Sequence, residues 1–335
     1  MDFGAMDTGR TPEQHAGTWP LGRALMTEST FCKLGIAMLL PLLLILGSCA
    51  TPDRAATFAS KAGAEQRITL PGPGLTLSGV LFPPAGARRA RHPAIVLLHG
   101  CSGMLDARGR LSSNQRAWAE RFAQWGFVAL TLDSFSPRGA GSICPIPSAE
   151  RPARPWEDRT ADAYAALAWL VRRSDVDPQR IFVAGWSHGG STVMGVVRPE
   201  APGRLADGPR FRAAIAFYPG CPRPPALNNY RPTMPLLILH GEADDWVPAA
   251  PCIDLARHFA DTPFIVRTLL YPGAHHGFDA PSNRLVFLPD VYNPRAPGGR
   301  GAHAGGHEPS RAHAVQETRA YLSGFLTSPL PGPAR

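Results

Sequence analysis

The sequence predicts a doubly wound α/β fold, in which helices cover both faces of a mostly parallel sheet. Short apolar runs rich in branched residues alternate with amphipathic segments at helical spacing, a pattern typical of strands buried on both faces. The expected strands are Leu75–Phe82, Ala94–Leu98, Phe127–Leu132, Ile181–Ala184, Ala213–Tyr218, Pro235–Leu239 and Phe264–Tyr271. The expected helices are Ser112–Trp125, Asp158–Arg173, Ser187–Val197, Pro251–Ala260 and Pro309–Leu326. The segment after Tyr218 is short, so no large cap domain is expected, and residues 293–308 are expected to be a flexible surface loop.

The composition excludes several classes of protein. Of the 335 residues, 44% are hydrophobic and only 18% are charged, so the chain can form a buried core and is not intrinsically disordered. The net charge of +8 comes almost entirely from arginines that are scattered along the chain. Scattered arginines are more typical of a solvated surface than of a nucleic-acid-binding stripe. The sequence therefore predicts no nucleic-acid partner, and nothing in it requires a protein partner.

The N-terminal region predicts export. The apolar run 34–47 follows Lys33 and is too short to span a bilayer, which needs about 20 residues. A basic flank, a short apolar run and small residues at its end are typical of a secretory signal peptide. The segment Leu46-Gly-Ser-Cys49 also resembles a bacterial lipobox, which implies that Cys49 is lipidated and becomes the first mature residue. Plain secretion and an uncleaved anchor are the alternatives.

Three segments follow from this interpretation: a leader and signal peptide at 1–48, a tether at 49–65 and a catalytic domain at 66–330. Residues 1–25 carry no apolar pattern, so translation could instead start at Met26. Because Ala50 rather than an aspartate follows Cys49, the lipoprotein resemblance implies the outer membrane, facing the periplasm.

One motif predicts a nucleophile. The segment Gly185-Trp-Ser-His-Gly-Gly190 follows an expected buried strand and opens an expected helix, which is the context of the G-x-S-x-G nucleophile elbow. The sharp turn requires small residues two positions on either side of Ser187, and the helix that starts there directs backbone N–H groups toward a reacting carbonyl. The alternative is a glycine-rich turn with an incidental serine.

Two later strands lead into a candidate acid and a candidate base. A serine hydroxyl needs a base that is held by a carboxylate, and in doubly wound hydrolases the acid and then the base follow the serine. Asp244 follows one strand and His276 follows the next, and their neighbours Asp245 and His275 are the competing candidates. Two further histidines at strand ends, His99 and His240, are expected to be structural.

At residues 75–328 the chain resembles an α/β-hydrolase of the dienelactone hydrolase-like group. The resemblance rests on the elbow, on HG-x-x-D-x-x-VP, which matches Asp244, and on H-G-F, which matches His276. It implies an oxyanion hole made by the backbone N–H groups of Cys101 and His188, although the Cys101 thiol could itself be a nucleophile. The chain departs from the group in having Ser187 where dienelactone hydrolases have a cysteine. This departure implies general ester chemistry rather than a dienelactone substrate.

The cysteines and Arg138 are expected at the same rim of the sheet. After Cys32 and Cys49 are set aside, Cys101, Cys144, Cys221 and Cys252 allow three disulfide pairings. Cys221–Cys252 is the expected pair, because both residues follow neighbouring strands. No C-x-x-C pair is present, so no metal site is predicted. Arg138 either binds a substrate carboxylate or braces its own loop.

These observations predict a serine hydrolase that cleaves small carboxylic esters without a cofactor. Ser187 attacks the ester carbonyl, His276 takes the proton, and Asp244 orients His276. Activity is expected to fall below about pH 6.5, where the histidine becomes protonated. The alternatives are a peptidase or polyester hydrolase that uses the same triad, and a lipoprotein that keeps the fold as a non-catalytic binding module.

Overall fold

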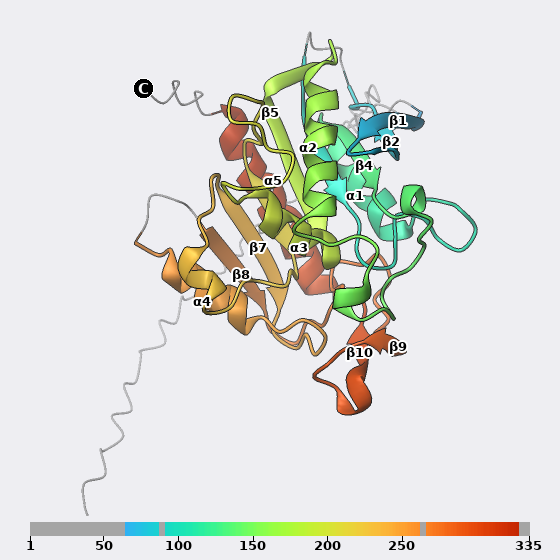
Figure 1. The fold of residues 1–335 in the computed structure, drawn as a ribbon, viewed down its shortest axis with the longest axis vertical. Coiled ribbons are helices and arrows are strands. Elements are labelled where there is room, and N and C mark those ends of the chain that lie inside the picture. Colours follow the sequence, from blue (N-terminus) through green and yellow to red (C-terminus); the bar gives the residue numbers. More distant parts are fainter. Residues whose placement is uncertain (1–63, 87–90, 262–265, 328–335) are drawn as a thin grey trace, which may run out of the picture. The chain divides into compact units, whose positions relative to one another are not determined.

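An eight-stranded sheet forms the centre of the computed structural model, which describes residues 64–86, 91–261 and 266–327 (Figure 1). The strand order is β1-β2-β4-β3-β5-β6-β7-β8. Strands β1 and β2 are antiparallel to their neighbours, and the remaining six strands are parallel. The predicted doubly wound, mostly parallel sheet is therefore confirmed. The expected signal peptide, the anchor at Cys49 and nearly all of the tether lie outside the described residues.

The sheet strands are β1 (Gln66–Gly72), β2 (Leu75–Phe82), β3 (His92–Leu98), β4 (Val128–Asp133), β5 (Val176–Trp186), β6 (Ala214–Phe217), β7 (Leu236–Gly241) and β8 (Val266–Tyr271). The helices are α1 (Ser113–Gln124), α2 (Asp158–Val171), α3 (His188–Val196), α4 (Ala250–His258) and α5 (Glu308–Thr327). A separate hairpin is formed by β9 (Val286–Tyr292) and β10 (Arg300–Ala304).

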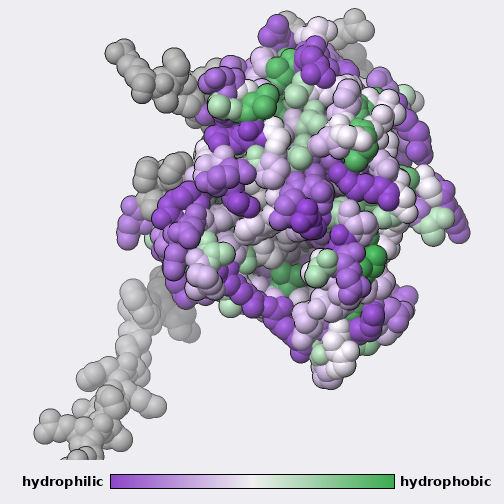
Figure 2. Space-filling model, viewed as in Figure 1, coloured by the Kyte–Doolittle hydropathy of each residue, from purple (hydrophilic) through white to green (hydrophobic). Residues whose placement is uncertain are grey.

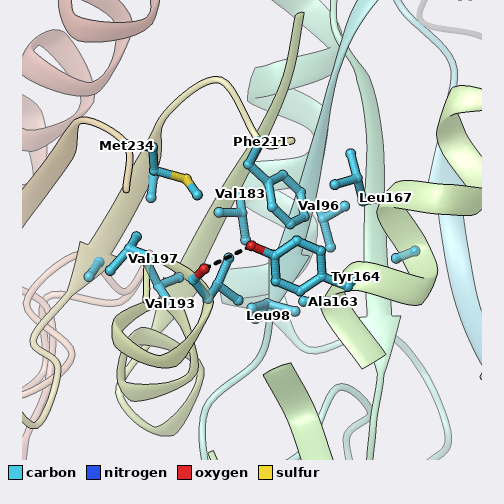
Figure 3. Close-up of a cluster of buried hydrophobic side chains, with 14 of the residues drawn as sticks. Val96, Leu98, Ala163, Tyr164, Leu167, Val183, Val193, Val197, Phe211 and Met234 are labelled. Carbon is cyan, nitrogen blue, oxygen red and sulfur yellow. Dashed lines mark hydrogen bonds between the residues drawn. The ribbon is translucent and has the colours of Figure 1, made fainter. Parts of the chain in front are cut away.

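The parallel strands divide their side chains between two hydrophobic layers, because successive residues of a strand point to opposite faces. In β3, Val96 belongs to a cluster that includes residues of α2, α3 and α4, whereas Leu97 belongs to a cluster that includes residues of α1 and α5. Figure 3 shows the first layer, where Tyr164 of α2 lies between β-sheet side chains and α3. The Tyr164 hydroxyl donates a hydrogen bond of 2.9 Å to the carbonyl of Val196, so this buried polar group is satisfied.

Two parts of the sequence-based prediction need correction. Strand β1 was not predicted, although it pairs with β2 along its whole length. The prediction of a flexible loop at 293–308 was wrong, since this segment contains β10, which pairs with β9. The glycines at 298, 299 and 301 have positive φ angles and form the turn and bulge of this hairpin, so its Gly content serves a defined structure.

The β9–β10 hairpin forms a second, two-stranded sheet. An isolated parallel bridge between His276 and Ala304 joins it to the loop after β8, at the carboxyl end of the sheet (Figure 1). The face seen in Figure 2 is mostly hydrophilic, as expected for a solvated surface rich in arginine. No helix of the described segments is long and apolar enough to cross a bilayer.

Candidate active site

The turn between β5 and α3 holds Ser187 in a strained conformation. Its φ of 54° and ψ of −114° lie outside the regions that side chains normally adopt. The turn is possible because its neighbours lack side chains: a Cβ at Gly185 would lie 2.1 Å from the Gly189 carbonyl oxygen, and one at Gly189 would lie 2.0 Å from that of Leu98. This geometry is that of a nucleophile elbow, in which the serine is raised above the sheet edge.

Three candidate residues are brought together by loops that follow β5, β7 and β8. His276 Nε2 lies 2.8 Å from Ser187 Oγ, and His276 Nδ1 lies 2.7 Å from Asp244 Oδ2. The other oxygen of Asp244 accepts hydrogen bonds from the backbone N–H groups of Trp246 and Val247. The carboxylate is thereby fixed against the base, and the chain Ser187–His276–Asp244 can move a proton away from the hydroxyl.

The environment keeps Asp244 charged and His276 in place. Burial opposes ionisation of Asp244, but the charge and hydrogen bond of His276 outweigh it, so the pKa of Asp244 lies below its usual value. The His276 ring packs between the rings of Tyr218 and Trp246, with centroid distances of 4.6 and 4.8 Å. It is 4% exposed, so its orientation is set by these contacts.

The competing candidates do not take part in this chain of hydrogen bonds. The Asp245 carboxylate instead contacts His303, whose Nδ1 lies 2.7 Å from Asp245 Oδ2. His275 contacts the His303 ring and makes no hydrogen bond to Ser187. The geometry therefore selects Asp244 and His276 over their neighbours.

Two backbone amides are available to bind an oxyanion. The N–H groups of Cys101 and His188 donate no hydrogen bond within the described part of the chain. The loop that carries Cys101 reaches the elbow, since a Cβ on Gly100 would lie 3.6 Å from Ser187 Cβ. The Cys101 thiol itself is bonded to Cys144, so it is not available as a nucleophile. The sequence analysis expected these two amides to form the oxyanion hole, and this assignment stays a prediction.

Residues 77–302 match the dienelactone hydrolase family. The chain belongs to this family. It is 29% identical to an uncharacterised protein of Mycobacterium tuberculosis over 61% of this chain and 69% of that protein. It is 25% identical to the protein usf of Aquifex pyrophilus over 60% of this chain and 81% of the relative.

Solved structures of the same fold include esterases and a peptidase. A dienelactone hydrolase-like promiscuous phosphotriesterase from metagenomic libraries aligns with a TM-score of 0.57 and 18% identity, covering 78% of this chain and 99% of that chain. Esterase 2 of Thermogutta terrifontis, phosphorylated by paraoxon, aligns with a TM-score of 0.55 and 21% identity, covering 79% and 96%. A puromycin-hydrolysing peptidase of Mycobacterium tuberculosis aligns with a TM-score of 0.54 and 18% identity, covering 80% and 40%.

Two cavities meet at Ser187 in this dienelactone hydrolase family member. One has a volume of about 220 Å³ and a largely apolar wall that includes Trp186, Tyr218 and Leu288. The other has a volume of about 360 Å³, and its wall includes Arg151, Arg223 and Arg295 but no carboxylate. None of these three arginines forms an ion pair with a described residue. Burial lowers the pKa of Arg295, and the nearby charge of Arg223 lowers it further.

His188 lies next to Ser187 at the wall of the arginine-lined cavity. The buried Arg159 donates from Nη1 to His188 Nδ1 at 2.8 Å, so the proton of the neutral imidazole lies on Nε2. Nε2 is buried and has no hydrogen-bond partner among the described residues. Burial lowers the pKa of Arg159 to about 9, and burial together with the charge of Arg159 holds the pKa of His188 well below its usual value. His188 is therefore a neutral residue next to Ser187, and its Nε2–H is buried.

Arg138 braces its loop. Its two terminal nitrogens donate to the two oxygens of the buried Asp162 at 2.8 and 2.9 Å, and Nη1 also donates to the Ser134 carbonyl. It does not line either cavity at Ser187. Of the two roles expected for Arg138, the geometry supports the structural one, and the sequence analysis missed the three arginines that do line the site.

Both pairs of cysteines are joined near the site. The predicted Cys221–Cys252 disulfide is confirmed, and Cys101–Cys144 forms a second one. Two structural disulfides are typical of proteins that fold in an oxidising compartment, such as the periplasm or the exterior of the cell.

Proposed function

We propose that this protein is a serine hydrolase of carboxylic esters that acts through an acyl-enzyme. The observation that carries the proposal is the continuous hydrogen-bonded chain from Ser187 Oγ through both nitrogens of His276 to Asp244. Ser187 attacks the ester carbonyl while His276 accepts its proton, and the imidazolium then protonates the leaving alcohol. Water, activated by the same histidine, releases the acid and restores Ser187.

The backbone N–H groups of Cys101 and His188 stabilise the negative charge that develops on the carbonyl oxygen. In other hydrolases, removing one such donor raises the activation barrier by about 3 kcal/mol. The Cys101–Cys144 disulfide supports this part of the proposal, because it fixes the loop on which the Cys101 amide lies.

The two cavities suggest the substrate class. The apolar cavity suits a small uncharged part of the ester, and the arginine-lined cavity suits a part that carries a negative charge. Three guanidinium groups that form no ion pair with a described residue give this second cavity hydrogen-bond donors, and no acidic side chain in its wall competes for them. We therefore favour esters of small acids or alcohols that bear a carboxylate or phosphate group.

The test compares wild-type protein with Ser187→Ala. Both are treated with a fluorophosphonate probe and assayed on p-nitrophenyl acetate and butyrate, and on p-nitroanilides of the same acids. Labelling and ester hydrolysis that are lost in the variant are expected. Faster cleavage of the anilides would favour the peptidase alternative, and a wild-type protein that neither labels nor hydrolyses any substrate would contradict the proposal in favour of a binding role.

The localisation of the protein in the cell is part of the same proposal. Cleavage before Cys49 and lipidation of that residue would anchor the enzyme at the outer membrane, facing the periplasm. The disulfides support an exported protein but do not distinguish an anchored form from a secreted one. Radiolabelled palmitate incorporated into wild-type protein, but not into Cys49→Ala, is the expected result.

A further inference from the structure

Three side chains that take no part in the proposed reaction gather beside it. Asp245, His275 and His303 each offer one ligand atom, and these atoms all lie within 4.8 Å of one another. We propose that they form a binding site for one divalent transition-metal ion, for which Zn²⁺ is the best fit. No spacing motif predicts the site, because its residues come from the loop after β7, the loop after β8 and strand β10.

The backbone holds the three segments in register. The His303 N–H donates to Asp245 Oδ1 at 3.0 Å, and Asn293 Nδ2 donates to the Asp245 carbonyl at 3.1 Å. The bridge between His276 and Ala304 aligns the neighbouring residues His275 and His303, whose ring centroids are 5.6 Å apart. The cluster is therefore positioned by contacts other than those among its own side chains, as a preformed site requires.

The contacts of these three side chains leave atoms available to bind an ion. His303 Nδ1 and Asp245 Oδ2 lie 2.7 Å apart, and a bound ion would take the place of this hydrogen bond. His275 Nδ1 is buried and has no hydrogen-bond partner among the described residues. Asp245 forms no ion pair with a lysine or arginine in the described part of the chain, so no cation of the protein competes for its carboxylate.

The donor set selects the type of metal. Two imidazoles and one carboxylate suit Zn²⁺ and its neighbours in the first transition series, and three protein ligands leave a fourth position for water. Ca²⁺ and Mg²⁺ prefer sites made entirely of oxygen, so this cluster fits them poorly. Both His303 and Asp245 are 43% exposed in their side chains, which leaves an entry path for the ion.

A bound ion would connect three segments of the chain. Asp245 and His275 directly follow and precede Asp244 and His276, so an ion here would join the acid loop, the base loop and the β9–β10 hairpin. The hairpin contributes Leu288 to the apolar cavity, so the ion would also hold one wall of that cavity in place.

The test uses untagged, full-length protein treated with EDTA. Isothermal titration with ZnCl₂ is expected to give one ion per chain, and a Zn²⁺ concentration of about 100 times Kd is expected to raise Tm by about 5 °C. Asp245→Asn, His275→Gln and His303→Gln should each weaken binding at least tenfold. Their circular dichroism and metal-free Tm are measured first, and Asp245→Asn keeps the shape of the side chain should a histidine variant fail to fold.

Two controls locate the ion. His313→Gln removes an exposed histidine that lies 3.7 Å from Glu317 and should leave binding unchanged. Ser187→Ala should also bind normally, because the site does not depend on the proposed reaction. Absence of Zn²⁺ binding in the wild type, or binding that survives all three cluster variants, would overturn the proposal, and MgCl₂ or CaCl₂ giving the same Tm shift would refute the assignment to a transition metal.

Discussion

Trp186 Nε1 donates a hydrogen bond of 2.7 Å to Asp279 Oδ2, so the residue before Ser187 is tied to the residue three positions after His276. The same carboxylate accepts hydrogen bonds from Trp118 Nε1 at 2.7 Å and from the Tyr218 hydroxyl at 2.6 Å. Asp279 is 3% exposed, and Asn114 Nδ2 donates a further hydrogen bond of 3.2 Å to Oδ2, so several neutral donors compensate the burial of the carboxylate. The network joins α1, the elbow, the strand end after β6 and the base loop.

Asp279→Asn is expected to lower the free energy of unfolding by about 2–5 kcal/mol. The amide keeps the shape of the carboxylate but removes the negative charge that the surrounding donors stabilise, and it has only one acceptor oxygen for them. Urea unfolding measures the loss. Asp290→Asn is the matched control, because Asp290 is exposed on β9, and it should change stability by less than about 0.5 kcal/mol. Equal stability of the two variants would contradict the role given to Asp279.

Stability is expected to fall as the pH drops below about 6.5. Burial lowers the pKa of His99, His188 and His240 in the folded protein, whereas the same residues have pKa values near 6.5 in the unfolded chain. Between the folded and unfolded values the unfolded chain binds more protons, so acid favours unfolding. Each histidine contributes a slope of up to about 1.4 kcal/mol per pH unit.

Urea unfolding at intervals from pH 7.5 to 4.5 measures this slope. His240→Gln should make the slope shallower, whereas His258→Gln should not, because His258 is exposed on α4. A stability that stays constant between pH 7 and pH 5 would show that these histidines are not buried in the neutral form.

Loss of the Cys101–Cys144 disulfide is expected to affect both stability and catalysis. The bond closes a loop with a sequence separation of 43, and such a cross-link contributes about 2–4 kcal/mol. The double variant Cys101→Ser/Cys144→Ser should lose that stability and, because the Cys101 amide is then less firmly held, should show kcat lowered at least tenfold. Cys221→Ser/Cys252→Ser is the control for a disulfide that lies off the proposed oxyanion loop. A similar fall in kcat in both variants would argue against a specific role for the Cys101 loop.

The sequence predicted the elements that carry a strong local pattern and missed those that depend on tertiary contacts. Ser187, Asp244 and His276 could be found because each follows a buried apolar strand within a recognisable motif. Strand β10 could not, because its Gly- and Pro-rich surroundings favour a loop until pairing with β9 fixes them. The arginines of the larger cavity were missed for a related reason. Arg151, Arg223 and Arg295 come from three separate loops, and only the fold brings them to Ser187.

These arginines give the last prediction, which concerns the choice of substrate. If the larger cavity binds a negative charge, p-nitrophenyl hydrogen succinate should have a lower KM than its neutral methyl ester. Arg223→Gln and Arg295→Gln should each raise KM for the charged ester about tenfold, which corresponds to about 1.4 kcal/mol, and should change KM for the neutral ester less than twofold. Added NaCl should raise KM for the charged ester only, since these two arginines are exposed and salt therefore screens their charge.

Arg231→Gln is the matched control, because Arg231 is exposed and its guanidinium donates to the carbonyl of Tyr230. Equal KM values for the two esters in the wild type would contradict the proposal of an anionic substrate. They would not contradict the proposal that Ser187 hydrolyses esters. A tenfold rise in KM for both esters in the arginine variants would instead mean that these side chains contact a part that the two esters share, because loss of a charge contact alone should weaken binding of the charged ester more.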